Sequence, residues 1–180
     1  FSSYYSGFAT YTAFRIADTI SYYGPSVHGF TLSGSYTSAA GNRRSTSRID
    51  DRRIQAALTY ALGDTRLAVG MDDRGDTGLG RDRVYGVSAS HQAGPWYFAA
   101  KYEVFDTNNH TPGAFSRDGN EAFNVFGSYS TGPYTFKAMF ARVQNYGGNI
   151  VHLGVDYQYN KSLKLFTEFY REGSTASIVE

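Results

Sequence analysis

The feature of this sequence that most restricts its fold is a two-residue alternation of apolar and polar side chains, repeated along nearly the whole chain. In FNVFGSYSTGPYTFKAMF, residues 123–140, apolar or small residues hold every second position from Phe123 to Tyr129 and again from Tyr134 to Phe140. The intervening Thr-Gly-Pro is typical of a tight turn. Because side chains alternate between the two faces of a β-strand, the pattern predicts strands with one apolar and one polar face.

Helical periodicity is nearly absent, and about ten alternating runs follow one another. Many of them approach the roughly 9–11 residues that cross a bilayer as a tilted strand. No run approaches the roughly 18 consecutive apolar residues of a membrane-spanning helix. The final residues, REGSTASIVE, are polar, and we expect no closing strand among them. The predicted strands comprise residues 15–23, 30–37, 53–62, 66–72, 85–90, 96–104, 123–130, 134–140, 151–159 and 163–170.

The connections between these runs are of two kinds that alternate along the chain. Short ones, rich in Gly, Pro, Asn or Asp, are expected at residues 63–64, 93–95, 131–133 and 160–161. Longer polar ones are expected at residues 38–52, 73–83, 106–121 and 144–149. This order places all long loops at one end of an antiparallel meander. It favours an up-and-down barrel over a Greek-key sandwich.

Aromatic residues gather near the ends of the predicted strands, as in the two interfacial girdles of a membrane barrel. We expect one girdle beside the short turns and a second beside the long loops. The alternative is ordinary aromatic pairing across a soluble sheet. The first girdle would contain Tyr22, Tyr23, Trp96, Tyr97, Tyr134, Tyr157 and Tyr159, and the second Tyr36, Tyr102, Phe105 and Phe169.

Composition excludes several classes of function. The chain has no cysteine, which removes disulfide and thiolate chemistry, and its net charge of +1 is too balanced for a nucleic-acid footprint. Its four histidines form no HExxH motif. No catalytic, metal-binding or cofactor-binding set emerges, so we do not expect an enzyme.

The stretch FRIADTISYYGPSVHGFTLSGSY, residues 14–36, resembles the segment after the constriction loop of general Gram-negative outer-membrane porins. The matching positions are Arg15, Ile20, Tyr22, Gly24-Pro25 and Gly29-Phe30. The resemblance implies a trimeric, sixteen-stranded transmembrane β-barrel with a water-filled channel. The whole chain, residues 1–180, would be one partial barrel domain. Residues 1–14 would end the constriction loop, residues 15–180 would supply the sixth to fifteenth strands, and Arg15 would be a wall arginine of the constriction.

If the apolar parity faces lipid, the other parity faces water in the channel. We therefore predict nine charged pore-lining residues with a slight basic excess, and with it a weak anion preference or little selectivity. The individual alternative for each is a solvated charge without a role of its own. These residues are Arg53, Arg66, Asp72, Lys101, Glu103, Lys137, Asp156, Lys164 and Glu168.

The predicted function is passive diffusion of ions and small hydrophilic solutes across the outer membrane of a Gram-negative bacterium. The expected partners are outer-membrane lipid, lipopolysaccharide and two further copies of the chain. A porin selective for sugars or anions is the first alternative, since Tyr97, Phe126, Phe166 and Tyr170 share the polar parity and sugars stack on aromatic faces. A soluble or surface-exposed β-sheet adhesion module, using the tripeptide Arg74-Gly75-Asp76, is the second.

Overall fold

The computed structural model describes residues 19–38, 52–76, 81–114, 117–173 and 175–179, and in these ranges it forms a single sheet of eleven strands. No helix in this part of the chain is long and apolar enough to cross a membrane. The strands are β1 (Thr19–Tyr23), β2 (Phe30–Thr37), β3 (Arg53–Leu62), β4 (Thr65–Asp76), β5 (Arg81–Ala93), β6 (Trp96–Thr107), β7 (Glu121–Thr131), β8 (Tyr134–Val143), β9 (Tyr146–Gln158), β10 (Lys164–Glu172) and β11 (Thr175–Val179).

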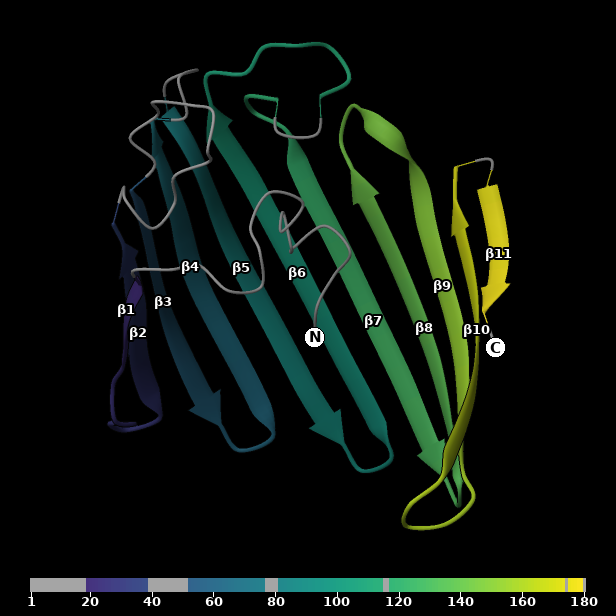
Figure 1. Ribbon diagram of the computed structural model, residues 1–180. Coiled ribbons are helices and arrows are strands. Elements are labelled where there is room, and N and C mark those ends of the chain that lie inside the picture. Colours follow the sequence, from purple (N-terminus) through teal and green to yellow (C-terminus); the bar gives the residue numbers. More distant parts are fainter. Residues whose placement is uncertain (1–18, 39–51, 77–80, 115–116, 174, 180) are drawn as a thin grey trace.

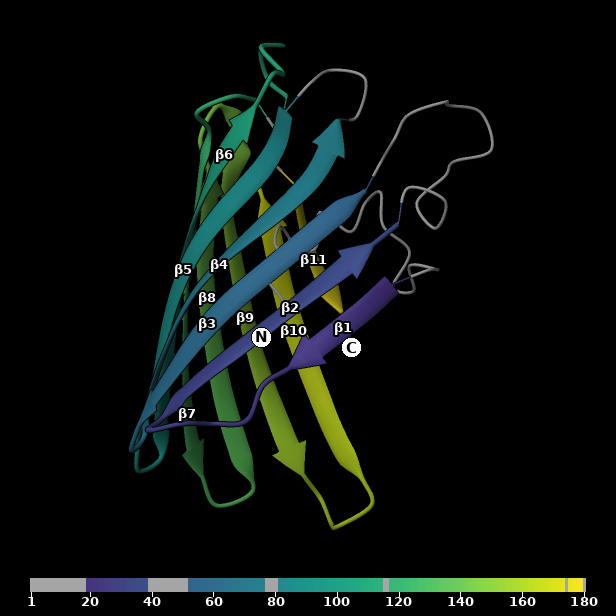
Figure 2. The same ribbon diagram turned by 90° about the vertical axis from the view of Figure 1, so that its left-hand side faces the viewer.

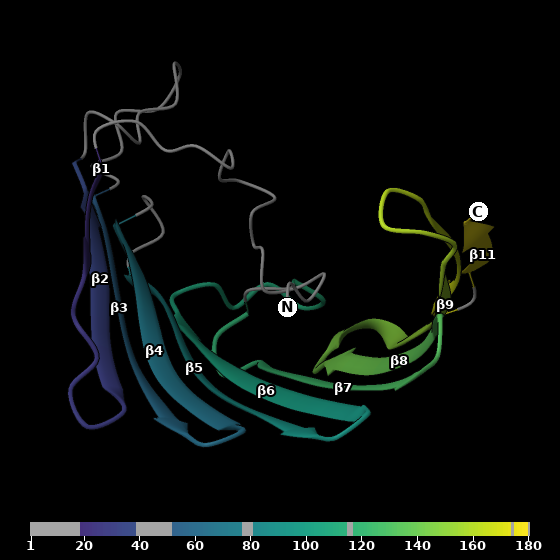
Figure 3. The same cartoon turned by 90° about the horizontal axis from the view of Figure 1, so that it is seen from below.

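Each strand pairs antiparallel with the next in the chain, so the predicted all-β, up-and-down order is confirmed (Figure 1). The sheet curves into an open trough with β1 and β11 at its edges (Figure 3). The count exceeds the predicted ten by one, because residues 175–179 pair with β10 from Glu172↔Thr175 to Glu168↔Val179. Five residues are too few for alternation to stand out in the sequence, and the expectation of a polar end without a strand was wrong.

The structure confirms the predicted short turns between β3 and β4, β5 and β6, β7 and β8, and β9 and β10. Gly63, Gly94 and Gly132 take positive φ angles of 55°, 57° and 54° in three short turns at one end of the sheet. The connection between β6 and β7 lies at the opposite end (Figure 2). The predicted loop at 144–149 is wrong, because β9 already begins at Tyr146. A tight turn precedes it, in which Asn145 has φ 57°.

The two faces of the sheet differ as the alternation predicts, and the differences are inverted relative to a soluble protein. Large apolar side chains on the convex face are exposed, for example Leu32 at 56%, Val69 at 52% and Leu165 at 53%. Several buried side chains on the concave face are polar or charged: Thr37, Arg53, Glu103, Thr107 and Asn124. A soluble sheet would bury the first set and expose the second.

Aromatic pairs line the convex face beside the short turns. Ring centroids lie 4.3 Å apart in Phe30–Tyr60, 4.4 Å in Trp96–Tyr129 and 4.9 Å in Tyr134–Tyr157. Three aromatic residues, Tyr23, Tyr97 and Phe105, depart from the predicted girdles because their positions in the strand place them on the concave face. Tyr97 contacts Phe126 there, with ring centroids 6.0 Å apart. Phe105, paired with Val84, is 1% exposed.

The buried apolar cluster of the described residues lies on the concave face of β5–β9, towards the long loops. It contains Val84, Phe105, Ala122, Ala141, Val143 and Ile150. The connection from β6 to β7 is anchored beside it by Asn120, whose side chain donates to the carbonyl oxygen of Ala114 at 3.0 Å and accepts from Asn145 at 3.1 Å. These contacts hold together a segment that would otherwise be a long polar loop.

Candidate functional site on the concave face

The strand registers place all nine charged residues of the predicted polar parity on the concave face. Arg53 pairs with Thr37, Arg66 with Ser90, and Lys137 with Gly154, so each strand contributes to the same face as its neighbour. Arg15, the predicted constriction residue, lies outside the described residues.

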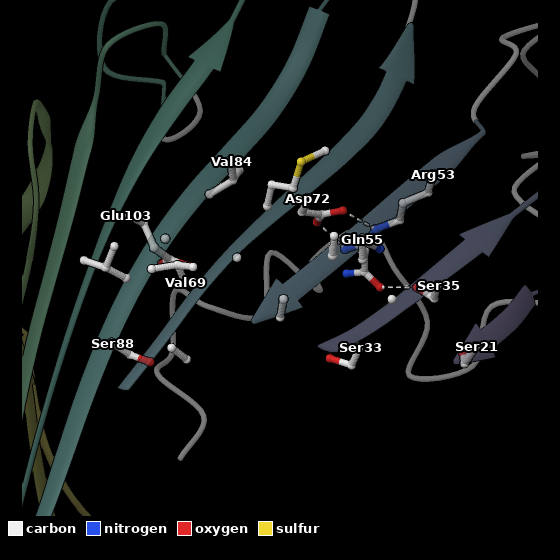
Figure 4. Close-up of a pocket in the computed structure, with 18 of the residues that line it drawn as sticks. Ser21, Ser33, Ser35, Arg53, Gln55, Val69, Asp72, Val84, Ser88 and Glu103 are labelled. Carbon is white, nitrogen blue, oxygen red and sulfur yellow. Dashed lines mark hydrogen bonds and ion pairs between the residues drawn. The ribbon is translucent and has the colours of Figure 1, made fainter. Parts of the chain in front are cut away.

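A hollow of about 590 Å³ lies over β1–β6 on this face. Small residues form much of its floor, together with the charged side chains of Arg53, Asp72, Lys101 and Glu103 (Figure 4). The short side chains leave room above this wall for water and solutes. The small floor residues include Ser33, Ser35, Ala57, Ala68, Gly70, Gly86 and Ser88.

Arg53 and Asp72 form a bidentate ion pair at the upper side of the hollow (Figure 4). Nε of Arg53 donates to Oδ1 of Asp72 at 2.7 Å, and Nη2 donates to Oδ2 at 2.5 Å. The planar guanidinium matches the two carboxylate oxygens, which makes this the stronger kind of charge-assisted contact. Below it, the hydroxyl of Ser35 donates to Oε1 of Gln55 at 3.0 Å. Gln55 was not predicted as a site residue, although its position in the strand alternation places it on the same face as Arg53.

Lys101 and Glu103 form a second ion pair along β6, with Nζ 2.5 Å from Oε1. Glu103 is nearly buried and lies against Gly86, the residue opposite it on β5. A Cβ at Gly86 would lie 3.4 Å from Cγ of Glu103. The glycine therefore gives the carboxylate a place close to the wall.

A larger network crosses β8, β9 and β10. Nζ of Lys137 lies 2.7 Å from Oδ1 of Asp156 and 3.4 Å from Oε1 of Glu168. Lys164 joins it through Oδ2 of Asp156 at 3.2 Å, and Nε2 of His152 lies 3.1 Å from Oε2 of Glu168. These five titratable side chains thus form one connected network of donors and acceptors.

Because Gly154 has no side chain, Lys137 on β8 can extend across β9 to Glu168 on β10. It stands between Lys137 and Glu168 in both registers, Lys137↔Gly154 and Glu168↔Gly154. A Cβ at this position would lie 3.1 Å from Cε of Lys137 and 3.6 Å from Cγ of Glu168. Any side chain there would therefore crowd the lysine that links the two carboxylates.

Opposite charges consequently lie next to each other on one wall. Of the five cations, Arg66 alone has no carboxylate within 4.0 Å in the described part of the chain. Neighbouring opposite charges cancel at a distance beyond their separation, so their field reaches only a short way into the solvent.

His152 is a member of the network that sequence reasoning did not assign. Its partner is Glu168 on the next strand, rather than Asp156, which lies nearer in the sequence. The described residues hold no group of three or more side chains that could bind a metal ion.

Comparison with known proteins identifies the family. A model of the family described as Gram-negative porin matches residues 1–177. A search of curated proteins finds no match.

Solved structures share the fold at low sequence identity. A double mutant of the Rh. blastica porin superposes with a TM-score of 0.67 at 16% identity, over 89% of this chain and 52% of that chain. A loop-deletion mutant of OmpT, an outer membrane protein of Vibrio cholerae, gives a TM-score of 0.60 at 14% identity, over 89% and 60%. The chain spans about half the length of the Rh. blastica porin that it matches.

Proposed function

The chain belongs to the Gram-negative porin family, and we propose that the complete protein forms a water-filled channel through the outer membrane. Ions and small hydrophilic solutes would cross it by passive diffusion, without catalytic turnover or cofactor. The concave face described above would be part of the channel wall, and its nine charged residues would line the pore.

The observation that carries this proposal is the inversion of the two faces. Fully burying one large aliphatic or aromatic side chain away from water is worth about 1.5–3 kcal/mol. The convex face exposes many of them, among them Leu58, Val87, Phe98 and Phe136. A lipid surround removes this cost, whereas the ion pairs of the concave face require water or each other. The adhesion alternative lacks comparable support, and residues 74–76 lie in β4 rather than in a loop.

The charge arrangement supports weak selectivity. Four of the five cations on the wall are held by carboxylates. Arg66 remains as an exposed positive charge on β4. We propose a slight anion preference that depends mainly on Arg66 and, through the resemblance in residues 14–36, on Arg15 at the constriction.

Assembly and lipid contacts are part of the same proposal. The resemblance supports a homotrimer in outer-membrane lipid, with lipopolysaccharide around the end that carries the long loops. Arginines at 43–52 are candidates for contacts with lipopolysaccharide phosphates. The neighbouring Arg53 is not, because its guanidinium is bound to Asp72 on the concave face.

The test is conductance of the complete protein in a planar bilayer, with reversal potential in a KCl gradient. We expect stepwise openings in groups of three and a small reversal potential of the anion-selective sign. Arg66→Gln should shift it towards cations, and the matched inner-face variant Gln55→Glu should shift it in the same direction. A silent protein would refute the channel, and strong cation selectivity would refute the charge argument.

A further inference from the structure

We propose that a small hollow on the concave face of β7–β10 is a binding subsite for one ring of a neutral polyhydroxy solute, such as a hexose. The proposal rests on the channel function above and specifies a solute class for one part of its wall. It concerns a place separate from the larger hollow over β1–β6.

The hollow has the size of a single ring. Its volume is about 160 Å³, and it is lined mainly by Phe126, Lys137, Met139, His152, Gly154 and Glu168. A protein cavity of about 150 Å³ accommodates one benzene molecule. The hollow therefore has room for one six-membered ring, whereas the substituents of a hexose and any further rings would extend along the wall.

One side of the hollow is polar and held in place. Lys137 and His152 approach Glu168 at 3.4 Å and 3.1 Å, and Lys137 is anchored a second time on Asp156 at 2.7 Å. Lys137 has three N–H donors and each carboxylate oxygen has two lone pairs, so capacity remains for solute hydroxyls. The absence of a side chain at Gly154 keeps these groups within reach of one small molecule.

The other side is apolar. Phe126 and Met139 face each other across β7 and β8, and the rings of Tyr97 and Phe126 are inclined to each other with centroids 6.0 Å apart. Such a ring offers a flat surface for the C–H face of a pyranose, while the opposite side offers donors and acceptors. Next to Met139, Asn124 is 5% exposed, and its Oδ1 has no hydrogen-bond partner. Sites of this composition combine apolar walls with a few placed polar groups.

The charge balance favours a neutral solute over an ion. Lys137 and Glu168 at the hollow already have an opposite charge within 3.4 Å. An incoming anion or cation would have to separate such a pair and would gain little net energy. Hydroxyl groups can donate to the carboxylates and accept from Lys137 without breaking either contact.

The experiment measures flux of radiolabelled glucose into proteoliposomes that contain the complete protein, over a range of glucose concentrations. Sorbitol, an open-chain polyol of similar mass, is the probe without a ring face. KCl conductance is recorded on the same preparations. We expect glucose flux to saturate and sorbitol flux to rise linearly.

Phe126→Leu should raise the half-saturating glucose concentration about three- to ten-fold, the worth of one aromatic contact. Phe126→Tyr should retain saturation, and Phe166→Leu, at an aromatic residue of the same face outside the hollow, should change nothing. KCl conductance should be normal in all three.

Linear glucose flux with normal conductance would overturn the subsite and leave the channel intact. Equal saturation by sorbitol, or an equal effect of Phe166→Leu, would also overturn it. If the zwitterion glycine betaine competes and glucose does not saturate, the charged network is the site and the polyhydroxy assignment is wrong. Absence of KCl conductance would instead refute the channel itself.

Discussion

Replacing Lys137 by methionine should weaken the barrel, because two carboxylates then lose the cation between them. Lys137 lies 2.7 Å from Asp156 and 3.4 Å from Glu168, and its side chain is 25% exposed. For the shorter contact, Coulomb's law gives a gross attraction of about 1.5 kcal/mol in bulk water and about 6 kcal/mol at an effective dielectric constant of 20. Desolvation and side-chain ordering offset much of this attraction.

The net effect should fall between two measured classes. Exposed ion pairs contribute about 0.2–1 kcal/mol, and breaking a buried pair costs about 3–5 kcal/mol. The partial exposure of this network places K137M near a loss of about 2 kcal/mol in free energy of unfolding. The methionine keeps most of the apolar stem, so the loss reports the charge.

A double-mutant cycle isolates the interaction. Urea unfolding of the complete protein in lipid vesicles would be measured for the unmodified protein, K137M, D156N and K137M/D156N. We expect a coupling energy of about 1 kcal/mol that decreases at high salt. Lys161→Met, at an exposed lysine in the turn before β10, is the control and should have no effect. A coupling below about 0.3 kcal/mol, within ordinary additivity error, would refute the argument that this network stabilises the wall.

Two further predictions test the faces and the loop. Val87→Arg, on the convex face, should destabilise the protein in vesicles by about 2–4 kcal/mol, whereas Ser88→Arg, one residue on and facing the channel, should leave urea unfolding nearly unchanged and alter conductance. Asn120→Ala removes the contacts to Ala114 and Asn145; limited proteolysis should then cut the connection between β6 and β7 several-fold faster, with unfolding of the whole barrel little changed.

The strands and their faces could be predicted from sequence because alternation is a local property. Side-chain direction depends only on position within a strand, so one apolar run assigns both faces. The structure near the long loops was harder to predict from the sequence. Phe105 keeps the polar parity although it is aromatic, and its burial depends on Val84 and Ile150 from other strands. The turn at Asn145 could not be predicted, because polar residues at the long-loop ends of the strands can belong either to a strand or to a loop.

The sequence predicted which charged residues share the concave face, but not which of them contact one another. Parity alone selected the nine charged residues, since each occupies a position that alternates with the apolar positions of its strand. Which of them pair depends on the stagger between strands. Glu168 lies 31 residues from Lys137, and only the two registers through Gly154 show that they meet. His152 had no visible partner in the sequence for the same reason.

The same registers bear on how such a wall selects solutes. Rings of one sign would attract or repel ions over the width of a channel, as far as the screening length of roughly 8–10 Å. Here most of the cations lie beside a carboxylate of the same or a nearby strand, as Lys137 brings its ammonium group across Gly154 to Glu168. The long-range electrostatic effect of the wall on ions is thereby reduced. Short-range contacts with Phe126, Met139 and the paired groups remain. A channel built in this way should discriminate between neutral solutes by shape and hydrogen bonding more strongly than it discriminates between small ions by charge.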